Sequence, residues 1–337
     1  MSRDLNHYKR YGWKVNEENL STLPATAPEA AKDLAKWLTL EGRRSSLEEW
    51  LGCVSDDGRI HGKFWHIGAW TQRMSHSSPN QANIPACWPD GLIPKSAVEE
   101  VKQKYDSDLR SLFKTDHYLV GADAEGIQLR ILAHYMQSAA YRDAILEGKK
   151  EDETDIHNLN KKALGGICRS RDDAKTFIYA WLLGAGLPKI ASILGCNVAQ
   201  AKTAVDNFLR SLPELNKLKS IKIPRDAARG YFTGLDGRRV KCNSEHLMLA
   251  GYLQSGEAII MKKATVLWTQ RAAKRGLRYR LVDFVHDEWQ VECPTEGEAE
   301  EVGKMMCKSL EDVGVQLGLF CPLEGNYVIG KNWRDTH

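Results

Sequence analysis

The spacing of apolar and polar residues predicts a chain of alternating helical and extended stretches. Leucine and alanine recur at helical intervals over residues 28–51, which predicts a short helical base. Residues 63–94 are rich in Trp, Ser, Asn and Pro, a composition typical of loops with brief strands. A helix is predicted over 98–113, then a buried strand at 118–122 and a second helix over about 126–137.

The second half of the chain predicts a helical unit followed by strands. Apolar spacing is helical almost throughout 139–230, with glycine and proline at the breaks. The remaining elements are predicted as strands near 231–241, a long helix over 253–274, a hairpin at 279–293, a helix over 297–313 and a terminal strand. Helices inserted between the strands of one sheet predict an α+β fold with an inserted helical lobe.

Composition argues against secretion and membrane insertion. The N-terminus is polar, and no stretch of the 337 residues approaches the roughly 20 apolar residues that span a bilayer. The eight cysteines form no C-x-x-C pair and no zinc-finger spacing, which is typical of reduced cytosolic thiols. A net charge of +3 is too small to indicate a nucleic-acid partner by itself.

Two adjacent acids, Asp287 and Glu288, stand near the bend of the predicted hairpin. Neighbouring carboxylates repel each other, and a sheet gains nothing from them unless cations share the site. The alternative is a solvated acidic turn, which is common in proteins.

A third acid, Asp123, ends the buried strand just before a helix. An aspartate in that place can simply cap the helix, which is worth about 1 kcal/mol. On this position alone the capping interpretation is favoured.

A basic helix face is predicted where Arg171, Lys175 and Tyr179 repeat every four residues. Like charges at that spacing disfavour a helix slightly unless phosphates lie along the face; a solvated basic face is the alternative. Two acidic centres, this face and a helical lobe together indicate phosphoryl transfer, in which two metal ions activate the attacking hydroxyl and stabilise the leaving oxygen.

In order and spacing, these three segments resemble the polymerase motifs of DNA polymerase family A, the group of bacterial DNA polymerase I and the replicative polymerases of short-tailed phages. The first motif covers 123–134, the second 171–186 and the third 285–288. Further matches, which extend the resemblance over nearly the whole chain, lie at 71–85, 155–157, 234–238, 253–255 and 332–337.

The resemblance implies a right-hand polymerase fold, with an antiparallel palm sheet, an inserted all-helical fingers subdomain and a largely absent thumb. Residues 1–52 would be an N-terminal helical base that is a thumb remnant. Residues 53–136 and 233–337 would form the two parts of the palm, and 137–232 the fingers.

By the same resemblance, the chain is a DNA-directed DNA polymerase that adds deoxynucleotides to a primer. Asp123 and Asp287 would bind two Mg²⁺ ions, for which Mn²⁺ could substitute, with the Ala124 carbonyl as a further ligand and Glu288 assisting. The nucleotide-binding residues would be His157, Arg171, Lys175, Tyr179 and Gln128, with Lys175 also the candidate acid for the leaving pyrophosphate. The DNA-binding residues would be Arg73, Asn80, Asn83, Gln254 and His286.

Several features depart from the family pattern. Gln128 stands where the family usually has a Glu that excludes the ribose 2′-hydroxyl, so a steric block is retained but the charge is not. Leu183 replaces a usual Tyr and Ala250 a usual Asn. Because an exonuclease domain and most of the thumb are missing, we expect a split or truncated polymerase and a partner polypeptide carrying the thumb and a 3′–5′ exonuclease.

Other readings of the sequence stay open at this point. A single-subunit RNA polymerase would share the palm and the basic helix. Gln128 is compatible with that alternative, because it replaces the Glu that excludes the ribose 2′-hydroxyl. A catalytically weak or inactive nucleic-acid-binding subunit is a second, and a structural protein with acidic turns is a third. The expected partners are primer-template DNA and dNTPs, and the expected location is the cytoplasm, that of a bacterial host if a phage encodes the chain.

Overall fold

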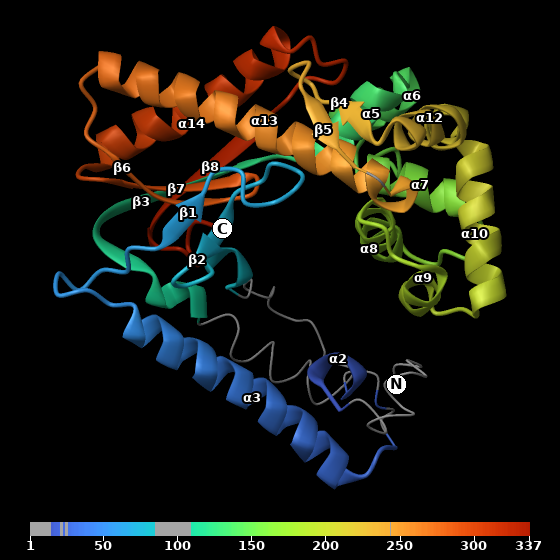
Figure 1. Cartoon of the computed structure of the whole chain (residues 1–337), viewed down its shortest axis with the longest axis horizontal. Helices are drawn as coiled ribbons and strands as arrows, with labels where there is room; N and C mark the ends of the chain where they lie inside the picture. The colour runs from blue at the N-terminus through green and yellow to red at the C-terminus, as the bar shows by residue number, and fades with distance from the viewer. Residues whose placement is uncertain (1–14, 21–22, 24–25, 85–108, 243) are drawn as a thin grey trace.

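A four-stranded antiparallel sheet forms the centre of the fold. The computed structural model describes residues 15–20, 23, 26–84, 109–242 and 244–337. The sheet has the strand order β6-β7-β3-β8. Its strands are β3 (Lys114–Ala124), β6 (Arg280–Val285), β7 (Glu288–Cys293) and β8 (Gly325–Asn332). All neighbouring pairs are antiparallel, so strands from the middle and the end of the chain lie side by side (Figure 1).

Two long helices cover one face of this sheet. They are α13 (Glu245–Lys274) and α14 (Glu296–Gln316), which pack on each other above the strands (Figure 1). Alternate side chains of a strand point to opposite faces, so Val120 and Ala122 of β3 join the main core, which includes Trp268 of α13 and Trp289 of β7. The intervening residues Gly121 and Asp123 therefore face the opposite side of the sheet.

That opposite side carries the N-terminal elements. They are the small helix α2 (Glu17–Leu20), the long helix α3 (Glu29–Gly52), the strand pair β1 (Lys63–Trp65) and β2 (Ser75–Ser77), and the short 3₁₀ helices η1 (Gln81–Asn83) and η2 (Arg110–Leu112). A second core cluster joins Trp50 of α3 to Leu119 of β3 and to Trp333. The end of α3 is thereby packed against the sheet.

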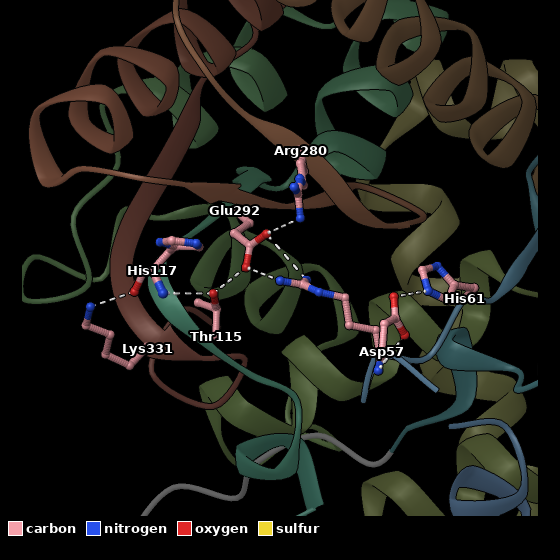
Figure 2. Close-up of polar contacts among 8 residues, drawn as sticks. Asp57, His61, Thr115, His117, Arg280, Glu292 and Lys331 are labelled. Carbon is pink, nitrogen blue, oxygen red and sulfur yellow. Dashed lines mark hydrogen bonds and ion pairs between the residues drawn. The ribbon is translucent and has the colours of Figure 1, made fainter. Parts of the chain in front are cut away.

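A buried carboxylate, that of Glu292 in β7, also ties this side to the sheet (Figure 2). Its oxygens accept hydrogen bonds from Arg59 at 3.2 and 3.4 Å and from the Thr115 hydroxyl, and Arg280 lies 3.7 Å away. Burial by itself raises the pKa of Glu292, but these donors hold it below its ordinary value. The segment after α3 is fixed to β7 in this way.

Helices make up the lobe between β3 and β4. They are α5 (Ile127–Met136), α6 (Ala139–Leu146), α7 (Ile156–Leu164), α8 (Arg171–Leu182), α9 (Leu187–Leu194), α10 (Val198–Ser211), α11 (Pro213–Lys217), the π-helical turn η3 (Leu218–Lys222) and α12 (Ile223–Arg229). Asp155, Ser170 and Asn197 cap α7, α8 and α10 by accepting hydrogen bonds from backbone N–H groups in the first turn. A short hairpin of β4 (Tyr231–Thr233) and β5 (Arg239–Lys241) follows the lobe.

The predicted α+β class is confirmed, and the differences from the sequence prediction concern element bounds. Helix α13 begins at Glu245 rather than at 253, because Ser244 caps it by accepting from the Leu247 N–H. Strand β3 is longer than predicted at both ends. The helix predicted at 98–113 lies mostly outside the described residues, and its described end is the single turn η2.

Two predictions from composition can be compared with the described residues. Each cysteine in the described part of the chain is a free thiol. Across the same residues, no helix combines the length and the apolar character that crossing a bilayer requires.

Candidate active site

The two acids predicted as metal ligands lie beside each other at one edge of the sheet. Asp123 is at the end of β3, directly opposite Glu288 of β7. Asp287 lies in the tight turn between β6 and β7, and its carbonyl accepts a hydrogen bond from the Ala124 N–H at 3.0 Å. Asp123 therefore does not cap α5; Gly126 occupies the cap position of that helix. Residues 164 positions apart (287 − 123) converge here.

The turn that holds Asp287 is strained. His286 adopts a φ of 56°, a left-handed conformation that non-glycine residues rarely adopt. Such a residue costs on the order of 1 kcal/mol or more, and strain of this kind concentrates at functional sites. The hairpin keeps the conformation because Val285 and Glu288 are paired on either side of the turn. The solvated acidic turn considered from the sequence is not what the structure contains.

Negative charge at this edge is incompletely neutralised. Burial, followed by the nearby Glu257 carboxylate, raises the pKa of Asp287 to about 7, and Asp123 adds to the rise while Arg73 opposes it. Removal from water, followed by the charge of Glu288, raises the pKa of Asp123. Two carboxylates that repel each other in this manner favour a bound cation.

The donor set fits a magnesium site of the kind used in phosphoryl transfer. Asp123 and Asp287 offer carboxylate oxygens, and the Ala124 carbonyl is adjacent in sequence to the first of them. Mg²⁺ is usually held by one or two carboxylates together with water and substrate phosphates rather than by a closed protein cage. Among the described residues, no group of three or more His, Cys, Asp or Glu side chains is placed to hold a metal.

Glu288 is occupied by other parts of the protein. Its Oε1 accepts hydrogen bonds from Gln290 at 2.6 Å and from the Trp333 indole at 2.5 Å, and His337 Nδ1 lies 2.9 Å from Oε2. Burial by itself raises the pKa of Glu288, but His337 and the other donors lower it below its ordinary value. The structure thus places Glu288 beside Asp123, with hydrogen bonds to Gln290 of β7 and to Trp333 and His337 of the C-terminal segment.

Helix α8 carries the predicted basic face, and its residue Tyr179 lies within electrostatic reach of Asp287. Arg171, Lys175 and Tyr179 follow one another along the helix, and Ser170 caps it by accepting from the Asp173 N–H at 2.9 Å. Lys175 is exposed, and the rings of Tyr179 and His157 lie 6.2 Å apart between centroids. Burial, followed by the charge of Asp287, raises the pKa of Tyr179, which indicates that α8 approaches the acidic edge.

The partner of Arg171 and the surroundings of His157 modify what the sequence predicts. The Arg171 Nε donates to Asp155 at 2.8 Å, and its Nη2 donates to the same carboxylate oxygen. Asp155 also caps α7 by accepting from the Asn158 N–H at 3.0 Å. A phosphate bound by Arg171 would share the guanidinium with Asp155. Burial, followed by the Arg171 charge, lowers the pKa of His157 to about 4, so this imidazole is neutral near pH 7.

The predicted DNA-contacting residues come from three separate segments. Asn80 and Asn83 are exposed at the two ends of η1, which lies against β2 and β6. Gln254 is the partly exposed residue in a stretch of α13, 248–261, whose other members are all buried. His286 is half-buried, and burial followed by the Arg73 charge lowers its pKa to about 4.

A residue that the sequence analysis missed, Glu257 of α13, connects two predicted site residues. Its Oε2 accepts a hydrogen bond from Arg73 Nη2 at 2.5 Å and another from Gln128 Nε2 at 3.1 Å. The side chain of Glu257 has no exposed surface. The one available signal was a glutamate within an otherwise apolar run of a long helix.

A cavity of about 430 Å³ lies apart from the acids, between the end of α8 and the start of α13. Trp181, Gly184, Lys219 and His246 are among its lining residues, and neither Asp123 nor Asp287 contributes to it. Leu183, one of the departures from the family pattern, is exposed, and its neighbours in sequence, Leu182 and Gly184, line the cavity. The carboxylate edge, not this cavity, is the candidate site.

The buried Asp283 in β6 predicts a pH dependence of stability. Burial raises its pKa to about 7, opposed by a hydrogen bond from the Phe284 N–H, whereas an unfolded aspartate titrates near 3.9. Between these values the folded chain binds the extra proton, so stability falls as the pH rises through that window. We expect Asp283→Asn to flatten the slope and to raise the free energy of unfolding at pH 8 by about 1 to 3 kcal/mol. Denaturant unfolding at pH 5 and pH 8 measures both, and an unchanged slope would contradict the assignment.

Comparison with known proteins shows a similar fold and then identifies the family. The fold is similar to that of a solved structure described as the POL domain of Pol1 from M. smegmatis in complex with DNA primer-template and dNTP, with a TM-score of 0.80 at 22% identity over 97% of this chain and 57% of that one. The family model for DNA polymerase family A matches residues 2–335. The chain belongs to DNA polymerase family A.

Relatives within the family include phage and bacterial enzymes. The DNA-directed DNA polymerases of Enterobacteria phage T3 and Escherichia phage T7 are each 31% identical, over 96% of this chain and 48% of the relative. DNA polymerase I of Chloroflexus aurantiacus is 27% identical over 98% of this chain and 35% of its own length. The chain thus spans about half the length of these phage relatives.

Proposed function

We propose that the chain is the catalytic portion of a DNA-directed DNA polymerase, which transfers deoxynucleotides to a primer 3′-hydroxyl under the direction of a template. The observation that carries the proposal is the convergence of Asp123 and Asp287, from separate parts of the sequence, at one edge of the sheet. Membership of family A and the likeness to a polymerase domain fold support it.

In this proposal Asp123, Asp287 and the Ala124 carbonyl hold two Mg²⁺ ions, which supply Lewis-acid stabilisation of the transferring phosphoryl group. Lys175, exposed on α8, donates a proton to the leaving pyrophosphate, and Arg171 neutralises phosphate charge. The ring of Tyr179 packs against the nucleotide. His157, neutral near pH 7, donates or accepts a hydrogen bond rather than adding charge.

The proposal also assigns the parts of the fold. The central sheet with α13 and α14 acts as the palm, over residues 53–136 and 233–337, and the helices of 137–232 act as the fingers. Residues 1–52 act as the base of a thumb. Arg73, Asn80, Asn83, Gln254 and His286 contact the primer-template.

Primer extension tests the function. The purified chain is mixed with Mg²⁺, a labelled primer and four templates that differ only in the first unpaired base, and each dNTP is offered singly. We expect each template to direct incorporation of its complementary nucleotide. A polypeptide that carries thumb and exonuclease should increase the affinity for primer-template. Binding of DNA with no incorporation under any condition would instead favour a non-catalytic binding subunit.

A further inference from the structure

Glu257 places an ionisable side chain in the middle of the protein core. The residues of α13 on either side of it, Gly256 and Ala258, are buried, and Ile259, Ile260 and Met261 continue the apolar run. A buried carboxylate is unfavourable unless it is paired and hydrogen-bonded, and an apolar residue of similar volume often stabilises a core at least as well. A contribution to the stability of the fold is therefore a weak explanation for a glutamate at position 257.

The hydrogen bonds of Glu257 join it to Arg73, proposed to contact the primer-template, and to Gln128, proposed to contact the incoming nucleotide. One carboxylate oxygen, Oε2, accepts from Arg73 at 2.5 Å and from Gln128 at 3.1 Å. Arg73 precedes β2, and Gln128 lies in the first turn of α5, four residues after Ala124. The carboxylate thus links the segment proposed to contact the primer-template with the helix that follows the metal ligand Asp123.

This cluster is also incomplete. Three of its buried atoms, Glu257 Oε1, Gln128 Oε1 and Arg73 Nε, have no hydrogen-bond partner among the described residues. Buried polar groups in a purely structural network are normally satisfied, and exceptions need an explanation. Two unpaired acceptors beside one unpaired donor, next to the carboxylate edge, are suited to contacts with a bound substrate.

We propose that Glu257 is a positioning residue that fixes the Gln128 side chain and thereby sets the preference for deoxynucleotides over ribonucleotides. The inference rests on the proposed function. Gln128 has a long side chain with several rotatable bonds, and its amide Nε2 donates to Glu257 at 3.1 Å while its buried Oε1 has no partner among the described residues. A hydrogen bond to a carboxylate is of the stronger, charge-assisted class, and it holds the amide in one orientation beside the sugar of the incoming nucleotide. Through Arg73 the same carboxylate fixes a second contact, with the primer-template.

Two substitutions separate these effects. Glu257→Gln removes the charge that holds Arg73 but retains an amide oxygen that can accept from Gln128. We expect its ratio of kcat/KM for dNTP to that for rNTP to stay within about threefold of the wild type, while its KM for primer-template rises about tenfold. Glu257→Ala removes both interactions, and we expect it to lower the sugar ratio about tenfold or more, to the value of Gln128→Ala.

A double-mutant cycle gives the decisive comparison. If Glu257 acts on sugar choice through Gln128, Glu257→Ala should have no further effect on the sugar ratio in a Gln128→Ala background. Additive losses would overturn the proposal, and so would a wild-type ratio in Glu257→Ala. Glu300→Gln, at an exposed position of α14, is the matched control. Thermal unfolding verifies folding, and if Glu257→Ala does not fold, a lowered sugar ratio in Glu257→Gln that matches Gln128→Ala would overturn the separation of roles.

Equilibrium binding makes the test independent of turnover. The affinities of a dNTP and the corresponding rNTP are measured by fluorescence on a dideoxy-terminated primer-template, where no incorporation occurs. We expect the wild type to prefer the dNTP and Glu257→Ala to have lost most of that preference. A chain that selects dNTPs in this assay and loses that preference in Glu257→Ala, but fails to extend primers, would contradict the proposed function and leave the role of Glu257 supported. Equal preference in the wild type and in Glu257→Ala would contradict the role of Glu257.

Discussion

Replacement of Asp287 by Asn is expected to lower the rate of primer extension by about 1,000-fold, because metal-ion stabilisation of the transition state is worth several kcal/mol and Asn is a far weaker ligand. The variant should fold. The pKa of Asp287 is raised to about 7, chiefly by burial and then by Glu257, so its charge disfavours the folded state near neutral pH. An uncharged side chain of the same size should leave the free energy of unfolding unchanged or slightly higher.

Single-turnover extension of a labelled primer measures this effect, and Asp57→Asn provides the matched control. Asp57 is an exposed acid in the segment after α3, and its carboxylate lies 2.9 Å from His61 (Figure 2). The same chemical change there should leave extension unaltered. If Asp287→Asn extends primers as fast as the control does, the acid does not hold a catalytic metal ion.

Replacement of Lys175 by Ala should lower kcat for nucleotide addition by about 100-fold, the lower end of what general acid catalysis contributes. The side chain is exposed on α8, so the loss should not reflect misfolding. Lys175→Arg distinguishes two roles, because a guanidinium retains the charge but does not release its proton near neutral pH. We expect the KM of Lys175→Arg for dNTP to match that of the wild type, while its kcat stays as low as that of Lys175→Ala.

Rapid-quench measurements of kcat and KM across several dNTP concentrations test this expectation. Recovery of kcat in Lys175→Arg would show that Lys175 contributes charge and not a proton. A wild-type kcat in Lys175→Ala would remove the residue from the mechanism altogether.

Local pattern was sufficient for most of the fold. The apolar run before Asp123, the alternation through the β6–β7 hairpin and the helical spacing of α14 each reflect side-chain directions set within a few residues. The apolar pattern predicts the start of α13 too late, because that pattern begins inside the helix, whereas the helix itself begins at the Ser244 cap. The ends of helices and strands depend on single capping contacts of this kind. They are therefore harder to predict from the sequence than the periodic spacing of apolar residues within the element.

The site was only partly predictable, for a physical reason. Asp123 and Asp287 are candidates from the sequence because each stands near the end of a predicted strand and matches a family motif. Glu257 was not, because its partners Gln128 and Arg73 lie 129 and 184 residues away in sequence. No local pattern reports a contact over such a separation. The pairing of Arg171 with Asp155 is a second contact that the sequence does not report. The family resemblance implies that Arg171 contacts phosphate, whereas the packing of α7 against α8 gives its guanidinium a carboxylate partner.

The most direct measurement of the central claim is the number of metal ions bound at the carboxylate edge. Mn²⁺ binding is followed by electron paramagnetic resonance in a complex of the chain, a dideoxy-terminated primer-template and the complementary dNTP. The two-metal account predicts two tightly bound ions per chain in the wild type and fewer in both Asp123→Asn and Asp287→Asn. The same number of tightly bound ions in the wild type and in both variants would contradict it.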